Sequence, residues 1–176
     1  MTSSSAPSTS TAPATPSVPA DVPTTGPNVT GPSERPPIEP ILATQHSAAG
    51  AKAFAEFFIR TIDWAYATNS AKYMRHYYEA SCIECRSAAD AVDKAVREGH
   101  HFIGDRFTIR RSAVLNSSNA STVVDVYFDV SAAEVVDGKG RFVDGLGALN
   151  NYRERITTAW RPSGWMVTDM LPKAGS

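Results

Sequence analysis

Apolar residues recur every three to four positions over residues 48–67, which predicts an amphipathic helix. Phe54 and Ile62 belong to its apolar stripe, and Ser47 is a suitable N-cap. Asp63 lies about half a turn away from Phe54 around this helix, at ~100° per residue, so we expect it to face solvent. The patterned part of the chain therefore begins with one long helix that has a single apolar face.

Two shorter helices are predicted next. Residues 71–80 place Tyr77 and Tyr78 on an aromatic-rich surface, because side chains four positions apart share one face of a helix. The third helix follows a pair of cysteines and ends near Gly99, because glycine is a natural C-terminal cap. All predicted helices thus precede the strands.

After Gly99 the spacing of apolar residues changes to two, which is typical of strands. Four strands are predicted, over residues 106–115, 122–132, 151–160 and 165–171. Residues 142–149 are rich in glycine and give no clear pattern. Helices that are segregated from strands indicate an α+β fold. We expect three N-terminal helices packed on a curved antiparallel sheet of about four strands, in the form of a cone with an internal pocket.

One strand carboxylate has the position expected of a pocket residue. Asp125 and Asp129 alternate away from the apolar face of their strand, so they should face outward. Glu154, in contrast, lies between Tyr152 and Ile156, two positions from each, and shares their apolar-facing parity. Burial there would disfavour the ionised form of Glu154 unless the carboxylate is paired.

Six side chains are candidates for the pocket. They are Tyr77, Tyr78, His101, Tyr152, Glu154 and Trp160. Glu154 or His101 could act as an acid or base, with a tyrosine hydroxyl as a hydrogen-bond donor. The alternatives are that the aromatic residues are ordinary core, that the histidines lie in a polar loop, and that Glu154 lies at the end of the sheet.

Composition divides the chain in two. Residues 1–43 hold 10 of the 12 prolines and 14 serines or threonines, and none of the 16 aromatic residues. Such a segment has little apolar surface to offset its ordering entropy, so we expect a disordered linker over residues 1–43 and a folded domain over residues 44–176. A net charge of −1 argues against nucleic-acid binding.

Cys82 and Cys85 allow four interpretations. We favour a structural disulfide in an oxidising compartment. A redox pair would need a strand before the motif, and here a helix is expected. A zinc site would need further ligands, for which His76, His100 and His101 are candidates, but the usual second ligand pair is missing. Two free cytosolic thiols are the last possibility. No metal or cofactor is expected.

An ordered set of residues resembles a known family. The set comprises Gly50, Ala51, Phe54, the run Asp63–Thr68, the segment Cys82–Cys85, Gly99, Phe102 and Gly104. It is similar to a family of uncharacterised actinobacterial lipoproteins over most of residues 47–171. That resemblance implies a cystatin-like or nuclear-transport-factor-2-like cone, export, and a lipid-bearing cysteine before a Ser/Thr/Pro-rich spacer. This chain has no cysteine or lipobox near residue 1, so anchoring is an expectation from the resemblance alone.

These features favour a non-catalytic binding or interaction domain displayed on the cell envelope. Its ligand would be a small apolar molecule or an envelope protein, and the membrane would be reached only through a lipid anchor. The outer face of the sheet mixes charges with aromatic residues, which suits a protein partner or a homodimer, or else is simply solvated. The alternative function is an acid/base enzyme of the isomerase, dehydratase or cyclase type that uses Glu154 or His101.

Overall fold

The computed structural model of the chain describes residues 16–104 and 106–173. Within this part of the chain, three α-helices precede seven strands. The helices are α1 (Ala48–Thr68), α2 (Lys72–Arg75) and α3 (Ile83–Arg97), and a 3-10 helix, η1 (Ile41–Thr44), comes before them. The strands are β1 (His100–Gly104), β2 (Phe107–Ser117), β3 (Thr122–Val130), β4 (Ala133–Asp137), β5 (Phe142–Leu146), β6 (Leu149–Arg161) and β7 (Gly164–Lys173).

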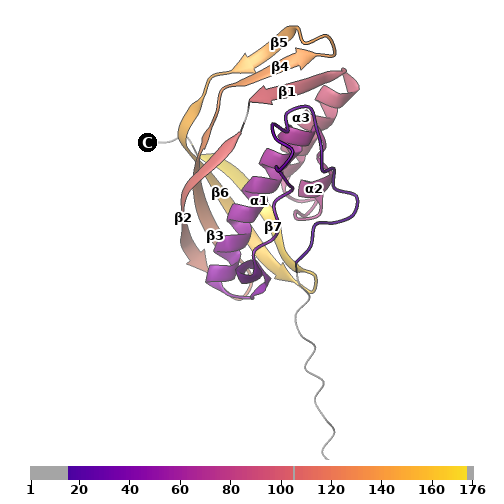
Figure 1. The fold of residues 1–176 in the computed structure, drawn as a ribbon. Coiled ribbons are helices and arrows are strands. Elements are labelled where there is room, and N and C mark those ends of the chain that lie inside the picture. Colours follow the sequence, from indigo (N-terminus) through magenta and orange to yellow (C-terminus); the bar gives the residue numbers. More distant parts are fainter. Residues whose placement is uncertain (1–15, 105, 174–176) are drawn as a thin grey trace, which may run out of the picture.

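The strands form two antiparallel sheets. The larger sheet has the order β2-β3-β6-β7, and the smaller sheet has the order β1-β4-β5. The larger sheet curves around α1, and the smaller sheet lies at one end of the molecule, near α3 (Figure 1). This architecture confirms the predicted α+β class, with three helices on a curved antiparallel sheet. Four strands is the correct number for the larger sheet, whereas the smaller sheet is not predicted by the sequence pattern.

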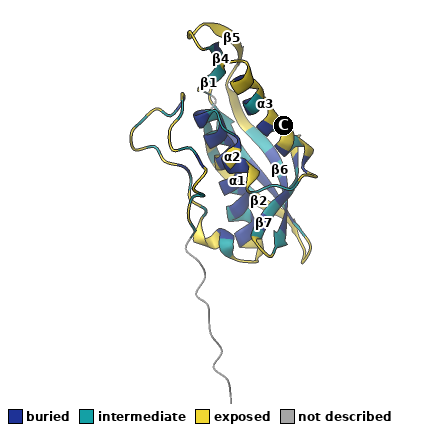
Figure 2. Ribbon diagram, turned by 90° about the vertical axis from the view of Figure 1, so that its right-hand side faces the viewer, coloured by how far each residue is buried: buried dark blue, intermediate teal, exposed yellow. Residues whose placement is uncertain are grey.

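The smaller sheet departs from the pattern for a local reason. The strand expected over residues 122–132 ends at Val130, and the chain crosses to the other sheet before β4 begins at Ala133. All five residues of β5 are exposed (Figure 2), so buried and exposed positions do not alternate along this strand. Alternation is the signal by which a half-buried strand is recognised in a sequence.

The helix expected over residues 71–80 is also shorter than predicted. Only α2, four residues long, forms there, and the chain then runs beside β7. The N–H of Val167 donates to the carbonyl of Tyr77 over 2.8 Å, and the N–H of Glu79 donates to the carbonyl of Val167 over 2.9 Å. Pairing with a strand therefore replaces the last turns of the predicted helix.

The long helix α1 is the centre of the core. Its predicted N-cap is correct, because the Oγ of Ser47 accepts a hydrogen bond from the N–H of Gly50 over 3.0 Å. The helix ends at Thr68, and its C-cap Asn69 has a left-handed backbone with a φ of 55°. Phe54 and Phe58 are fully buried between the helices and the larger sheet. No helix within the described residues is long and apolar enough to cross a membrane.

The boundary expected at residue 43 differs from the structure. Residues 16–43 do not extend freely from the domain but lie against α1 and α2 (Figure 1). The indole N–H of Trp64 donates to the carbonyl of Pro23 over 2.9 Å, and the N–H of Asn28 donates to the carbonyl of Ala67 over 3.0 Å. This part of the predicted linker therefore belongs to the folded domain, while residues 1–15 lie outside the described residues.

Asp63 does not face solvent as the helix pattern predicts. Its carboxylate accepts hydrogen bonds from Nε and Nη2 of Arg106, each over 3.0 Å, and from the N–H of Phe107 over 2.9 Å. Arg106 also pairs with Glu34, at 2.5 Å. Burial alone would lower the pKa of Arg106, but the hydrogen bonds and charges of Asp63 and Glu34 outweigh it and raise that pKa. These side chains connect residues 16–43, α1 and β2.

Candidate functional site

A cavity of about 360 Å³ lies between α1, α3 and the concave face of the larger sheet. Its size falls at the lower end of the range that is typical of small-molecule sites. Most of its lining is apolar or aromatic and comes from several separate segments of the chain. The apolar and aromatic lining includes Ile59, Ile62, Tyr66, Ala88, Ala91, Phe107, Phe128, Val130, Leu146, Leu149, Tyr152, Met170 and Pro172. The cavity is partly open to solvent.

Glu154 is the most deeply buried acid of this lining. It lies opposite Val126 in the pairing of β6 with β3, and it is only 6% exposed. Its Oε2 atom has no hydrogen-bond partner among the described residues. Burial, together with the smaller effect of the charge of Glu84, raises the pKa of Glu154 to about 7. The carboxyl group therefore exchanges its proton near neutral pH.

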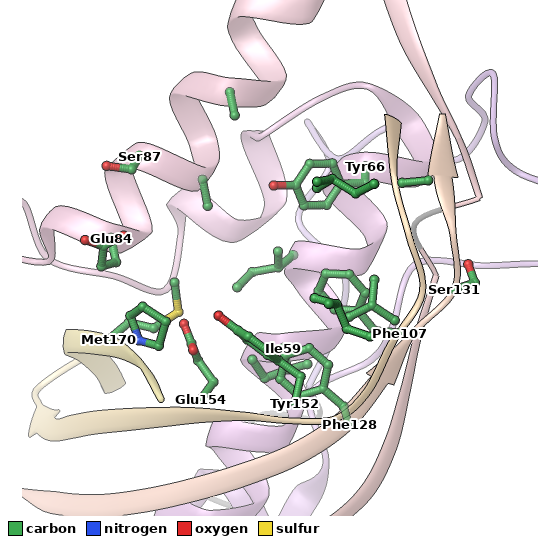
Figure 3. Close-up of a pocket in the computed structure, with 18 of the residues that line it drawn as sticks. Ile59, Tyr66, Glu84, Ser87, Phe107, Phe128, Ser131, Tyr152, Glu154 and Met170 are labelled. Atoms are coloured by element: carbon green, nitrogen blue, oxygen red, sulfur yellow. The ribbon is translucent and has the colours of Figure 1, made fainter. Parts of the chain in front are cut away.

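Further polar side chains border the cavity, among them four from three elements. Figure 3 shows Tyr152 beside Glu154 on the sheet, Tyr66 on α1, and Glu84 and Ser87 on α3, around one common space. Burial raises the pKa of Tyr152, and the charges of Glu154 and Glu84 add to this effect, so its hydroxyl stays protonated. The site can thus offer hydrogen-bond donors and acceptors along one side of an apolar space.

The structure separates the six predicted pocket residues. Tyr152 and Glu154 line the cavity, whereas Tyr77, Tyr78, His101 and Trp160 do not. These four residues make other contacts within the domain.

Tyr77 packs edge-on against Phe57, with ring centroids 5.0 Å apart. Tyr78 forms a bridge to Val167 of β7. Trp160 stacks on His46 with ring centroids 5.0 Å apart.

His101 lies on β1, opposite Val136 of β4. Tyr77, Tyr78 and Trp160 pack against the hydrophobic core, which matches the alternative of ordinary core packing for these three residues.

Several cavity residues were missed by sequence reasoning, although some carried a signal. Ile59, Ile62 and Tyr66 follow steps of three and four along α1, and Phe128 shares the inward parity of its strand. Glu84 had no such signal. Its side chain reaches the cavity from the first turn of α3, which begins directly after Cys82 (Figure 3).

The two cysteines lie at disulfide-bonding distance. Their sulfur atoms are 1.98 Å apart, and Cys82 is also the N-cap of α3. Among the described residues, no group of three or more histidine, cysteine, aspartate or glutamate side chains is arranged to hold a metal ion. The Cys82–Cys85 pair and the N-cap at Cys82 position the first turn of α3, which carries Glu84.

The outer face of the larger sheet carries paired charges. Asp125 does lie on this face, as the parity predicts, but it is only 2% exposed because arginines cover it. Arg155 donates two hydrogen bonds to the carboxylate of Asp125, over 2.8 and 3.0 Å. The guanidinium carbon of Arg111 lies 3.4 Å from the centre of the Tyr127 ring. Many charges of this face are therefore satisfied within the sheet.

The fold and the cavity define the class of protein, which is an α+β domain with helices closed over a curved antiparallel sheet around an internal pocket. The chain belongs to DUF6318, a family of unknown function whose model matches residues 13–171. Among curated proteins, none matches the chain.

Several solved structures are similar in fold. One is the intermembrane space region of the chloroplast protein ARC6, with 14% identity and a TM-score of 0.47, over 69% of this chain and 95% of that one. Another is described as a putative aromatic ring hydroxylase from Novosphingobium aromaticivorans, with 12% identity and a TM-score of 0.48, over 68% and 85%. A third is a domain of unknown function with a cystatin-like fold from Nostoc punctiforme, with 10% identity and a TM-score of 0.43, over 72% and 78%.

Proposed function

We propose that this domain is a non-catalytic receptor for a small, largely apolar ligand, which binds in the cavity between α1, α3 and the larger sheet. The observation that carries the proposal is the pairing of an apolar, partly aromatic lining with one buried carboxyl group whose Oε2 has no protein partner. Binding sites for small molecules commonly combine a mostly apolar wall with a few polar groups that orient the ligand.

The energetic argument follows from the lining. Transfer of apolar ligand surface from water into such a cavity is favourable by about 25 cal/mol per Å². The buried Oε2 of Glu154 is left without a hydrogen bond in the described structure, which is unfavourable for a polar atom. A ligand that covers the aromatic rings would gain the free energy of apolar transfer. If it also bonds to Oε2 of Glu154, it would remove the cost of leaving that atom without a partner.

A fluorescent apolar probe tests the proposal directly. N-phenyl-1-naphthylamine is neutral and increases its fluorescence when it leaves water, so titration into the full chain should give a saturable signal with one site. Ala88→Trp on α3 should abolish this signal, because the indole would fill the cavity that Ala88 lines. Val96→Trp is the matched control, since Val96 is on the same helix, 51% exposed and outside the lining. Equal binding to both variants would contradict the proposal.

We also propose that the domain is exported and displayed at the cell envelope, with a lipid anchor in the native protein. The Ser/Thr/Pro-rich composition of residues 1–43 and the bonding distance between Cys82 and Cys85 support this location, because disulfides persist in oxidising compartments. Fractionation of the native host should recover the protein with the envelope, without reactive thiols. Recovery from the cytosol with two free thiols would contradict export.

Acid/base catalysis by Glu154 is the second candidate function. The specific observation in its favour is a carboxyl group with a pKa of about 7 beside Tyr152, since an acid or base is most effective when its pKa lies near the working pH. His101 lies on β1 outside the lining of this cavity, so the second candidate rests on Glu154. A bound ligand recovered chemically unchanged after long incubation supports a receptor. A product that forms with the native chain and not with Glu154→Gln supports an enzyme.

A further inference from the structure

The charged groups of the cavity all have one sign. Glu154 and Glu84 line it, and no lysine, arginine or histidine is among its described lining residues. This is unusual for the chain as a whole, in which 17 basic residues nearly balance 18 acidic ones. Elsewhere in the domain, the partly buried Asp63 and the buried Asp125 are paired with arginines of the protein itself.

Aromatic rings surround the same space. Tyr66, Phe107, Phe128 and Tyr152 all line the cavity, and Figure 3 shows Tyr152 next to Glu154. The faces of aromatic rings carry negative electrostatic potential and attract organic cations, more strongly where water is excluded. Acids and aromatic rings in one apolar space therefore favour a ligand with a positive charge.

We propose that the ligand is a hydrophobic amine, whose ammonium group pairs with Glu154 while its apolar body covers the aromatic lining. This inference rests on the proposed function, because it specifies the chemical class that the same cavity binds. The ammonium group donates to Oε2 of Glu154, the atom that lacks a partner among the described residues. The amine thus takes the place that arginine takes beside Asp63 and Asp125.

The same groups discriminate against other ligands. A carboxylate ligand would meet two like charges in a space of low polarity, which is unfavourable. A neutral alcohol can accept a hydrogen bond from protonated Glu154, but it gains no ion pair once Glu154 has lost its proton. Among ligands of one size, the affinity should therefore decrease in the order amine, alcohol, carboxylate.

The dependence on pH follows from the titratable groups that line the cavity together with Glu154. These are Glu84 on α3, Tyr66 on α1 and Tyr152 on β6, while β3 and β7 contribute only apolar side chains to the lining. The tyrosine hydroxyl of Tyr152 stays neutral because its pKa is raised. Affinity for an amine should rise as the pH passes the pKa of Glu154, about 7, because only the ionised carboxylate forms the pair.

Three naphthalene probes with the same apolar body provide the test. The full chain is titrated by calorimetry at pH 8 with 1-naphthylmethylamine, 1-naphthylmethanol and 1-naphthoate. We expect the amine to bind at least about tenfold more tightly than the alcohol, and the carboxylate to give no saturable binding. At pH 6 the affinity for the amine should fall by about tenfold, while that for the alcohol stays level or rises.

Two matched variants identify the acid. Glu154→Gln should lower the affinity for the amine by at least about tenfold, because it removes the negative charge. The affinity for the alcohol should stay within about threefold of the native value. Glu134→Gln removes the same charge from an exposed position of β4, outside the lining, and should change neither affinity. The pH series on the native chain gives an independent measurement if Glu154→Gln does not fold.

The outcomes separate this inference from the proposed function. Equal affinities for amine and alcohol, both lost in Ala88→Trp, would overturn the amine and leave the apolar receptor in place. Tight amine binding that Glu154→Gln does not weaken would overturn the role of Glu154. No binding of any naphthalene probe or of N-phenyl-1-naphthylamine would overturn both.

Discussion

Glu154 interrupts the inward row of apolar side chains along β6. Its burial follows from strand parity alone, which is why the sequence pattern could single it out, and the structure places it at 6% exposure with Tyr152 beside it in the cavity. The pattern could not show that the lining described in the structure holds no arginine to pair with Glu154. Arg153 and Arg155 have the opposite parity to Glu154, and both lie within 4 Å of Asp125 on the outer face.

The unpaired carboxyl of Glu154 should affect stability in a way that depends on pH. Its folded pKa, about 7, lies above its ordinary value of 4.5, so the folded state holds the proton more tightly. Stability that is present below about pH 4.5 is therefore lost as the pH rises toward 7. Glu154→Gln should match the native free energy of unfolding at pH 4 and exceed it at pH 8, by up to about 3 kcal/mol.

Urea denaturation at pH 4, 6 and 8 measures this effect. Glu134→Gln is the control, because that side chain is exposed and its substitution should give the same small change at every pH. A difference between Glu154→Gln and the native chain that stays constant from pH 4 to pH 8 would contradict the burial of an ionisable group at this position.

At the scale of elements, the long helix was predictable and the segment before it was not. The periodicity of α1 extends over five turns, and its cap at Ser47 has the expected geometry. The composition of residues 16–43 predicted a disordered linker, because composition reports only how much apolar surface a segment can bury. This segment is held to a large extent by backbone groups, such as the carbonyl of Pro23 on Trp64 and the N–H of Asn28 on Ala67.

Gly26 shows how closely this segment approaches α1. A Cβ atom at Gly26 would lie 2.2 Å from the Cα of Thr68 and 2.6 Å from the carbonyl oxygen of Ala67, which are both backbone atoms. Gly26→Ala should therefore push the segment away from the helix and lower the free energy of unfolding by about 1–3 kcal/mol. Urea denaturation followed by tryptophan fluorescence measures this, because the Trp64 indole loses its bond to Pro23.

Gly31→Ala is the matched control within the same segment. The nearest atom to a Cβ there is the Oγ of Ser33 at 4.0 Å, so the alanine fits without displacement. Equal stabilities of the two alanine variants would contradict the packing of residues 16–43 on α1.

Over the whole molecule, the two sheets differ in how firmly they are held. β3 and β6 are interior strands of the larger sheet, and the inward residues Val124, Val126 and Ile156 are fully buried. β5 pairs only with β4, at the edge of the smaller sheet, and every residue along it is exposed. Local opening needs least free energy where few apolar contacts are lost.

Hydrogen exchange of the backbone amides should reflect this difference. We expect the amides of β5 to exchange at least about a hundredfold faster than those of β3 and β6 under native conditions. Exchange monitored by NMR or mass spectrometry measures the ratio, and the β4–β1 pairing gives an internal comparison within the smaller sheet. Similar protection along β5 and β3 would show that the smaller sheet opens only when the whole domain unfolds.

The overall class was predictable because helices and strands are segregated along the chain, whereas the second sheet was not. The Gly-rich residues 142–149 carry no alternation, yet they form β5 and its junction with β6. The gathering of cavity residues was only partly predictable for the same reason. Parity identifies which side of a strand faces inward, but not which inward residues border an unfilled space.

The lining of the cavity has a consequence for how relatives of this domain could diverge. The acid at Glu154 is fixed within an interior strand, while Leu146 and Gly147 border the same space where the chain passes from β5 to β6. Insertions or deletions in this connection would reshape that side of the cavity without disturbing the hydrophobic core. Evolution could therefore exchange one guest molecule for another by altering loop length, while the chemical group that recognises them is inherited unchanged.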